Sequence, residues 1–164
     1  MSRRVNGDRA EGAAADPIDL RELRSCTAAR LRRAARRVSQ LYDDALEPAG
    51  VTIAQFGLLA QLEGSLAQST TGIALGELAE RMTTDPTTLT RNLRPLEARG
   101  LLRTAPDTQD RRVRRIRITP TGRAALRAAI PLWRRAQAQV EGALGSGDVG
   151  TLRALLERTA AASF

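Results

Sequence analysis

The sequence predicts a mainly α-helical protein with one small β-hairpin. Over most of the chain, apolar residues recur every three or four positions, which is the period of an amphipathic helix. Helix-capping residues and helix-ending glycines interrupt that pattern at several places. Around residues 101–119 the pattern changes to apolar residues alternating with arginines about a polar turn, which indicates two antiparallel strands.

The composition narrows the classes of function. The chain has 164 residues, 26 of them basic and 18 acidic, so its formal net charge is +8. All the basic residues are arginine and histidine is absent, which excludes catalytic and zinc sites built on histidine. A single cysteine cannot form an internal disulfide, so we expect a reducing, cytoplasmic environment and no cofactor or metal. No apolar run is long enough for a membrane span or a signal peptide, and we expect neither.

The N-terminal part is predicted to hold a leader and one long helix. Residues 1–18 lack an apolar run and combine glycine and alanine with mixed charge, which is typical of a disordered segment. Residues 19–49 carry a single apolar stripe of helical period, which starts at Leu20 and ends before Pro48 and Gly50.

A central domain, residues 50–118, is predicted to begin with a capped helix. Thr52 and Gln55 have the spacing of a capping box. The helix that they start is expected to bury Ile53, Phe56, Leu59 and Leu62.

Two short helices are expected after a polar loop and the apolar segment Ile73-Ala74-Leu75. The first covers Glu77–Met82. The second begins after a turn of about four residues, with Asp85 as its cap and Pro86 in its first position, and Gly100 ends it. Two short helices joined in this way match a helix-turn-helix.

The second of these helices has an apolar face and a polar face. Leu89, Leu93 and Leu96 are predicted to face the core, and Pro95 predicts a kink. The other face carries side chains of the kind that hydrogen-bond to base edges and phosphates. The predicted base contacts are Thr87, Thr88 and Arg91, and the predicted phosphate contacts are Thr90, Asn92 and Arg94. The alternative is the ordinary polarity of a helix surface.

An arginine-rich hairpin follows. Its strands are expected over Leu101–Ala105 and Arg111–Thr119, with a bulge near Val113. From Arg103 to Arg123 there are seven arginines and two aspartates, a net charge of 7 − 2 = +5. Beside a helix-turn-helix, such a charge favours contact with DNA, although a solvated basic surface is the alternative.

Within the hairpin, the turn holds the residues of most interest. The residues predicted to contact DNA are Gln109, Arg111, Arg112 and Arg114. Asp107 and Asp110 would repel phosphate, so one or both are expected to orient a neighbouring arginine through an ion pair.

Two further helices are predicted in residues 119–164. Thr119 and Pro120 start the first, whose apolar residues from Leu126 to Leu144 have a nearly heptad spacing. Residues 145–148 are expected to break it before a final amphipathic helix. The long helices at both ends of the chain have apolar stripes that so small a domain cannot cover, so we expect them to dimerise.

Taken together, these elements form a winged helix-turn-helix flanked by long dimerisation helices. In this arrangement the chain resembles the MarR family of bacterial transcriptional regulators, over roughly Leu23 to Ala161. The stretches that carry the resemblance are residues 78–82 (LAERM), 93–101 (LRPLEARGL), 107–112 (DTQDRR) and 118–122 (ITPTG).

The resemblance implies a homodimer on double-stranded DNA. In the family, the helix that corresponds to Asp85–Arg99 enters the major groove, and the hairpin, or wing, reaches the flanking minor groove. Many members have an arginine where Gln109 stands, and that arginine probes the minor groove. With Gln109 there, Arg111 or Arg112 would take over that contact, or the wing would contact only phosphates.

Cys26 allows two interpretations. One branch of the family carries a peroxide-sensing cysteine near this place, and Tyr42 matches a tyrosine that supports it. Cys26 lies about two residues early, and a second supporting tyrosine is replaced around Arg30–Arg33. Cys26 is therefore either a redox sensor or a small residue packed where two subunits meet.

The resemblance also implies a small-molecule inducer, because family members often release DNA when a small molecule enters a cleft. Tyr42, Phe56 and Trp133 are candidates to line that cleft, with a place in the core as the alternative.

The function predicted is that of a sequence-specific DNA-binding regulator, more often a repressor in this family, on a pseudo-palindromic operator. A non-specific nucleic-acid or chromatin protein on the same fold is the main alternative. A helical adaptor for a protein partner is another. The lack of histidine, lysine and a glycine-rich phosphate loop argues against an enzyme.

Overall fold

The structure, a computed structural model, describes residue 20, residues 22–66 and residues 71–163. The predicted leader, residues 1–18, lies outside the described residues. The chain forms two compact units, one ending at Ala34 and the other beginning at Ala35. The first unit contains a 3-10 helix, η1 (Glu22–Ser25), and the beginning of helix α1 (Thr27–Leu46). The single helix predicted from residue 19 onward is therefore wrong in its first turns: the α-helix begins only after Ser25-Cys26, residues with low helix propensity.

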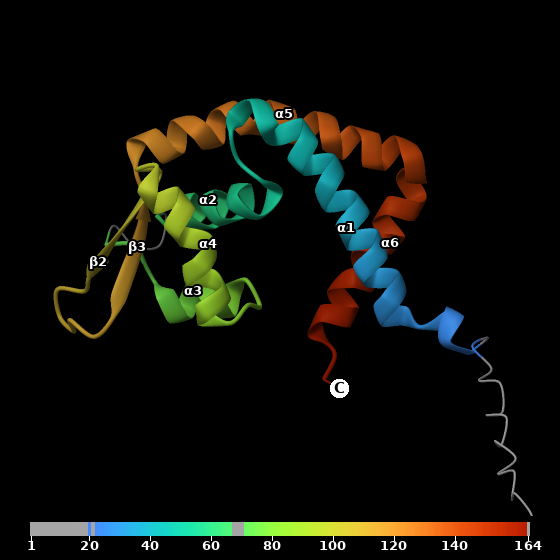
Figure 1. Cartoon of the computed structure of the whole chain (residues 1–164), viewed down its shortest axis with the longest axis horizontal. Coiled ribbons are helices and arrows are strands. Elements are labelled where there is room, and N and C mark those ends of the chain that lie inside the picture. The colour runs from blue at the N-terminus through green and yellow to red at the C-terminus, as the bar shows by residue number, and fades with distance from the viewer. Residues whose placement is uncertain (1–19, 21, 67–70, 164) are drawn as a thin grey trace, which may run out of the picture. The chain divides into compact units, whose positions relative to one another are not determined.

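The second unit contains the rest of α1 and the remaining elements, of which Figure 1 labels α2–α6, β2 and β3. The 3-10 helix η2 (Glu47–Ala49) follows α1 directly. After it come α2 (Ile53–Ser65), β1 (Ile73–Ala74), α3 (Leu75–Arg81), α4 (Pro86–Ala98), β2 (Leu102–Pro106), β3 (Arg114–Ile118), α5 (Pro120–Leu144) and α6 (Ser146–Ala161). None of the helices in the described ranges combines the length and the apolar character that crossing a bilayer requires.

Local signals set most of the helix ends. The predicted capping box is present, because the Thr52 hydroxyl accepts from the Gln55 N–H while the Gln55 side chain accepts from the Thr52 N–H. Asp85 and Thr119 cap α4 and α5 with the side-chain bond alone, accepting from the N–H groups of Thr88 and Gly122, and each is followed by a proline. The predicted break after α5 is present but shorter than residues 145–148: Gly145 alone interrupts the helix, and α6 starts at Ser146.

The strands form a three-stranded antiparallel sheet in the order β1-β3-β2. The sequence predicted a hairpin alone and took residues 73–75 only as a short apolar segment. The predicted bulge near Val113 is also wrong: β2 and β3 pair one residue to one from Leu102↔Ile118 to Pro106↔Arg114. The second strand starts at Arg114 rather than Arg111, because the segment before it forms the turn.

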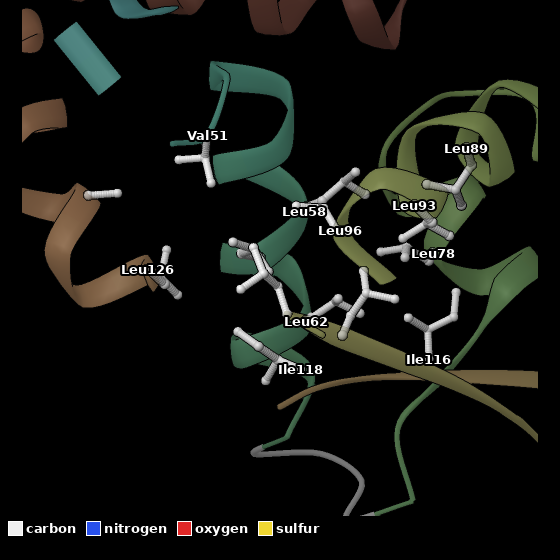
Figure 2. Close-up of a cluster of buried hydrophobic side chains, with 14 of the residues drawn as sticks. Val51, Leu58, Leu62, Leu78, Leu89, Leu93, Leu96, Ile116, Ile118 and Leu126 are labelled. Atoms are coloured by element: carbon white, nitrogen blue, oxygen red, sulfur yellow. The ribbon is translucent and has the colours of Figure 1, made fainter. Parts of the chain in front are cut away.

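The core lies between α2, α4 and the sheet, as Figure 2 shows. The three leucines predicted to face inward from α4 are all buried. Leu58, Leu59 and Leu62 of α2 are nearly inaccessible to solvent and pack in the same cluster. Because leucines of α4 and isoleucines of β3 share this core, the helix and the hairpin are held by one packed unit.

Candidate nucleic-acid interface

Helix α4 presents its polar face to solvent. Asp85 accepts a hydrogen bond from the Thr88 N–H at 2.8 Å, and the interaction with Thr88, through its side chain first and its backbone N–H second, lowers the pKa of the Asp85 carboxyl. The capped start places Thr87, Arg91 and Arg94 on the exposed side, opposite the buried leucines. A hollow of about 450 Å³ runs along this side, lined by Pro86, Thr87, Thr90, Arg91 and Arg94.

One of the predicted contact residues on α4 is engaged within the helix itself. The Thr90 hydroxyl donates to the Pro86 carbonyl at 2.7 Å. This hydroxyl has one hydrogen, so Thr90 cannot donate it to DNA while the bond lasts. Thr88 is half-buried. Asn92 is half-buried. Of the predicted contact residues on α4, the exposed ones are Thr87, Arg91 and Arg94.

The turn of the hairpin is organised by Asp107. Its carboxylate accepts the N–H groups of Gln109 and Asp110, at 2.7 and 3.1 Å, and pairs with the Arg115 guanidinium. These interactions lower the pKa of Asp107 to about 2, the bond from Arg115 having the largest effect. The carboxyl is therefore ionised at neutral pH and holds the turn in shape.

Arg115 in turn ties the hairpin to the segment before β1. It donates to the Gly72 carbonyl at 2.9 Å. Gly72 has φ +98°, and a Cβ there would lie 2.4 Å from Cγ of Arg117 and 2.5 Å from the Ile116 carbonyl oxygen. Only glycine fits so close to β3. Sequence reasoning missed both Arg115 and Gly72, because their contact spans 43 positions of the chain.

Asp110 acts differently from Asp107. Its side chain accepts the Arg112 N–H at 2.9 Å, which makes it a turn residue. Gln109, Arg111, Arg112 and Arg114 are all exposed around this turn. Of the seven arginines counted from residue 103 to residue 123, Arg115 is paired with Asp107 and Arg123 with Glu63.

Helix α4 and the hairpin meet at a shared hollow. This hollow of about 200 Å³ is lined by Leu75, Thr90, Leu93, Arg94, Glu97, Thr104, Arg114 and Ile116. Arg94 comes from α4 and Arg114 from β3, so cations of both elements border one groove. Glu97 accepts a hydrogen bond from the Thr104 N–H at 2.9 Å. Sequence reasoning also missed this bond, although Glu97 lies in the stretch that resembles the MarR family.

The other predicted site residues do not line this groove. Cys26 is exposed just before α1. Tyr42 is buried, and its hydroxyl donates to Oε1 of Gln137 at 2.5 Å. Phe56 and Trp133 stack with ring centroids 6.0 Å apart and pack against the core. The three aromatic residues thus have packing roles, and both the ligand cleft and the redox role of Cys26 stay predictions.

Comparisons with known proteins agree with this architecture. The model of the MarR family matches residues 51–113. A crystal structure of the M. tuberculosis transcriptional regulator MosR in complex with DNA is 38% identical, covers 82% of this chain and 98% of its own, and has a TM-score of 0.67. The transcriptional repressor CouR, bound to a 23-mer DNA duplex, is 27% identical, covers 88% and 99%, and has a TM-score of 0.75.

A more distant structure shows the same fold. It is a MarR mutant from E. coli complexed with operator DNA, which is 22% identical, covers 87% of this chain and 99% of its own, and has a TM-score of 0.74. Curated protein sequences give no significant match.

Proposed function

The chain belongs to the MarR family of transcriptional regulators, and from this we propose that it is a homodimeric, sequence-specific DNA-binding protein that represses transcription. The observation that carries the proposal is the groove shared by α4 and the hairpin. Arg94 and Arg114 border it from two elements, with Thr87 and Arg91 exposed along the same helix. A polar helix face beside a basic hairpin suits a duplex, since a helix fits the major groove and cations bind phosphates.

In the proposed complex, α4 is the recognition helix and the hairpin is the wing. Arg91 is the candidate reader of a base, because arginine forms two hydrogen bonds with guanine in the major groove. Arg94 and the exposed wing arginines neutralise phosphates. With two subunits, the two recognition helices call for half-sites about one helical turn, ~34 Å, apart on a pseudo-palindromic operator.

Release of the DNA is proposed to follow a population shift. An inducer or an oxidation event that favours a different dimer geometry would move the two recognition helices out of that spacing. This regulator would act in the cytoplasm, where its DNA is, and we assign it a binding role rather than a catalytic one.

The test is selection of duplexes from a random pool, followed by competition. The protein should stay bound to a specific operator when random duplex is added in excess. If random duplex displaces it as effectively as the operator sequence does, the non-specific alternative is favoured. A chain with no affinity for any duplex at low salt would favour the adaptor. The selected sequence is then the probe for substitutions.

Two arginines of α4 should behave differently on that probe. Arg91→Ala should lower the preference for one base pair by about 1–3 kcal/mol. Arg94→Ala should weaken binding to all duplexes and reduce the slope of log K against log salt by about one. Arg158→Ala, at an exposed position of α6, is the control with the same loss of charge.

A further inference from the structure

At the edge of the three-stranded sheet, a backbone N–H group of β2 bonds to a side chain of α4. β2 is an edge strand, since the order is β1-β3-β2. The Asp107 N–H donates to the Val113 carbonyl, and the Leu101 carbonyl accepts the Thr119 N–H. The odd-numbered residues of this strand therefore direct their backbone N–H and C=O groups toward β3. In an antiparallel pair the intervening residues point their N–H groups away from the partner strand. Thr104 is one of them, paired with Ile116 in the register.

The side chain of Glu97, in the last turn of α4, is the hydrogen-bond partner of this N–H group. Its carboxylate accepts the outward Thr104 N–H at 2.9 Å. Two residues further along, Pro106 has no N–H to offer at the equivalent outward position. Helix α4 also packs on β2. The bond between Glu97 and Thr104 is therefore a direct polar link between the helix and the strand.

The charge of Glu97 is unfavourable for a surface that meets DNA. Glu97 is exposed, and it is the one acidic group among the described residues that line the groove with Arg94 and Arg114. None of the ion pairs formed by the described residues involves Arg94 or Arg114. A carboxylate in this place repels phosphate and does not neutralise either arginine, so electrostatics alone predicts that its removal strengthens binding.

We propose that Glu97 is a positioning residue for DNA binding. Its bond to Thr104 holds the wing at a fixed distance from α4, so that Arg91 and Arg94 on the helix and Arg111 and Arg112 on the turn engage one duplex together. This inference rests on the proposed function. A carboxylate that only covered a strand edge would leave the contribution of the wing to binding unchanged when it is removed.

The experiment compares two substitutions of Glu97 on the selected duplex. Glu97→Gln removes the charge and keeps an acceptor of the same length, whereas Glu97→Ala removes both. Each is combined with the wing double substitution Arg111→Ala/Arg112→Ala. The wing substitution should weaken binding by the same factor in the wild-type and Glu97→Gln backgrounds, and by a factor at least about threefold smaller in the Glu97→Ala background.

A second variant removes the bond from the donor side. Thr104→Pro deletes the outward N–H, which proline can do at an edge position, and it should reproduce the effect of Glu97→Ala. Both variants are checked for an unchanged melting temperature, and if one fails to fold the other still decides the result. If Arg111→Ala/Arg112→Ala weakens binding by the same factor in every background, the positioning role of Glu97 is overturned. A wild-type protein without preference for its selected duplex would overturn the proposed function instead.

Discussion

Asp107 is an acidic residue that shapes the turn of the hairpin, a surface proposed to bind DNA. Its carboxylate is the acceptor for two backbone N–H groups and for Arg115. Charge alone makes it unfavourable near phosphate, just as for Asp110. The difference lies in the partners, because the Asp110 carboxylate accepts one N–H group, from Arg112, in the described structure.

Two matched substitutions separate charge from structure in the turn. Asp107→Asn should weaken binding to the operator by roughly threefold to tenfold, since the loss of a charge-assisted bond to Arg115 loosens the turn. Asp110→Asn removes the same charge and should leave affinity equal or slightly stronger. The measurement is a fluorescence-anisotropy titration of both variants at one salt concentration. Tighter binding by Asp107→Asn would show that the turn does not depend on this carboxylate.

At the scale of elements, the start of α5 fixes the wing to the helix-turn-helix. The Thr119 hydroxyl donates to the Gly100 carbonyl at 2.6 Å and accepts the Gly122 N–H at 3.0 Å, while its own N–H donates to the Leu101 carbonyl. A Cβ at Gly122 would lie 1.9 Å from the Leu101 carbonyl oxygen. The glycine is thus required by space, because the first turn of the helix passes directly over the backbone that leads into β2.

This close approach predicts opposite effects for the same substitution at two places in α5. Gly122→Ala should lower the free energy of unfolding by about 2 kcal/mol or more, because backbone rather than a flexible side chain must move. Gly142→Ala, where nothing lies within 4 Å of the added Cβ, should raise it by about 0.5–1 kcal/mol through helix propensity. Urea denaturation measures both. Equal effects at the two glycines would contradict the packing of α5 on the Leu101 carbonyl.

For the whole molecule, the helices at the C-terminal end leave an apolar surface that a second copy can cover. Gln137 of α5 and Arg153 of α6 both donate to Glu141, at 2.9 and 2.8 Å, and these bonds lower the pKa of the Glu141 carboxyl. This network, with the buried Val149, docks the start of α6 on α5. The same helix exposes Leu152, Leu155 and Leu156, with 40%, 49% and 45% of their surface accessible.

If a dimer covers these leucines, charges introduced on the leucine face of α6 should weaken dimerisation, and charges on the opposite face should not. Leu152→Asp/Leu156→Asp places two carboxylates one helical turn apart on the apolar face and should give monomers with weakened operator binding. The control Gly150→Asp/Ala154→Asp adds the same charge with the same spacing on the opposite face and should stay dimeric. Sedimentation gives the mass of each variant. A wild-type monomer would refute the dimer, and a dimeric leucine variant would place its interface elsewhere.

The sequence by itself determined the helices and most of their ends. Capping at Thr52, Asp85 and Thr119 and the leucine spacing of α4 act between residues three or four positions apart, so a short window of sequence contains the whole cause. The arginine-rich hairpin and the polar face of α4 could be predicted for the same reason. Their contacts with DNA stay predictions.

Only the tertiary structure decided which of those polar side chains are already bonded within the protein and which are exposed. The pairing of β1 with β3, the bond from Arg115 to Gly72 and the ion pair of Arg123 with Glu63 join residues 41 or more positions apart. The bond from Thr104 to Glu97 spans seven positions but crosses from a helix to a strand. Such pairs form because one element packs on another. That packing depends on side chains from distant parts of the sequence, which a short window does not contain.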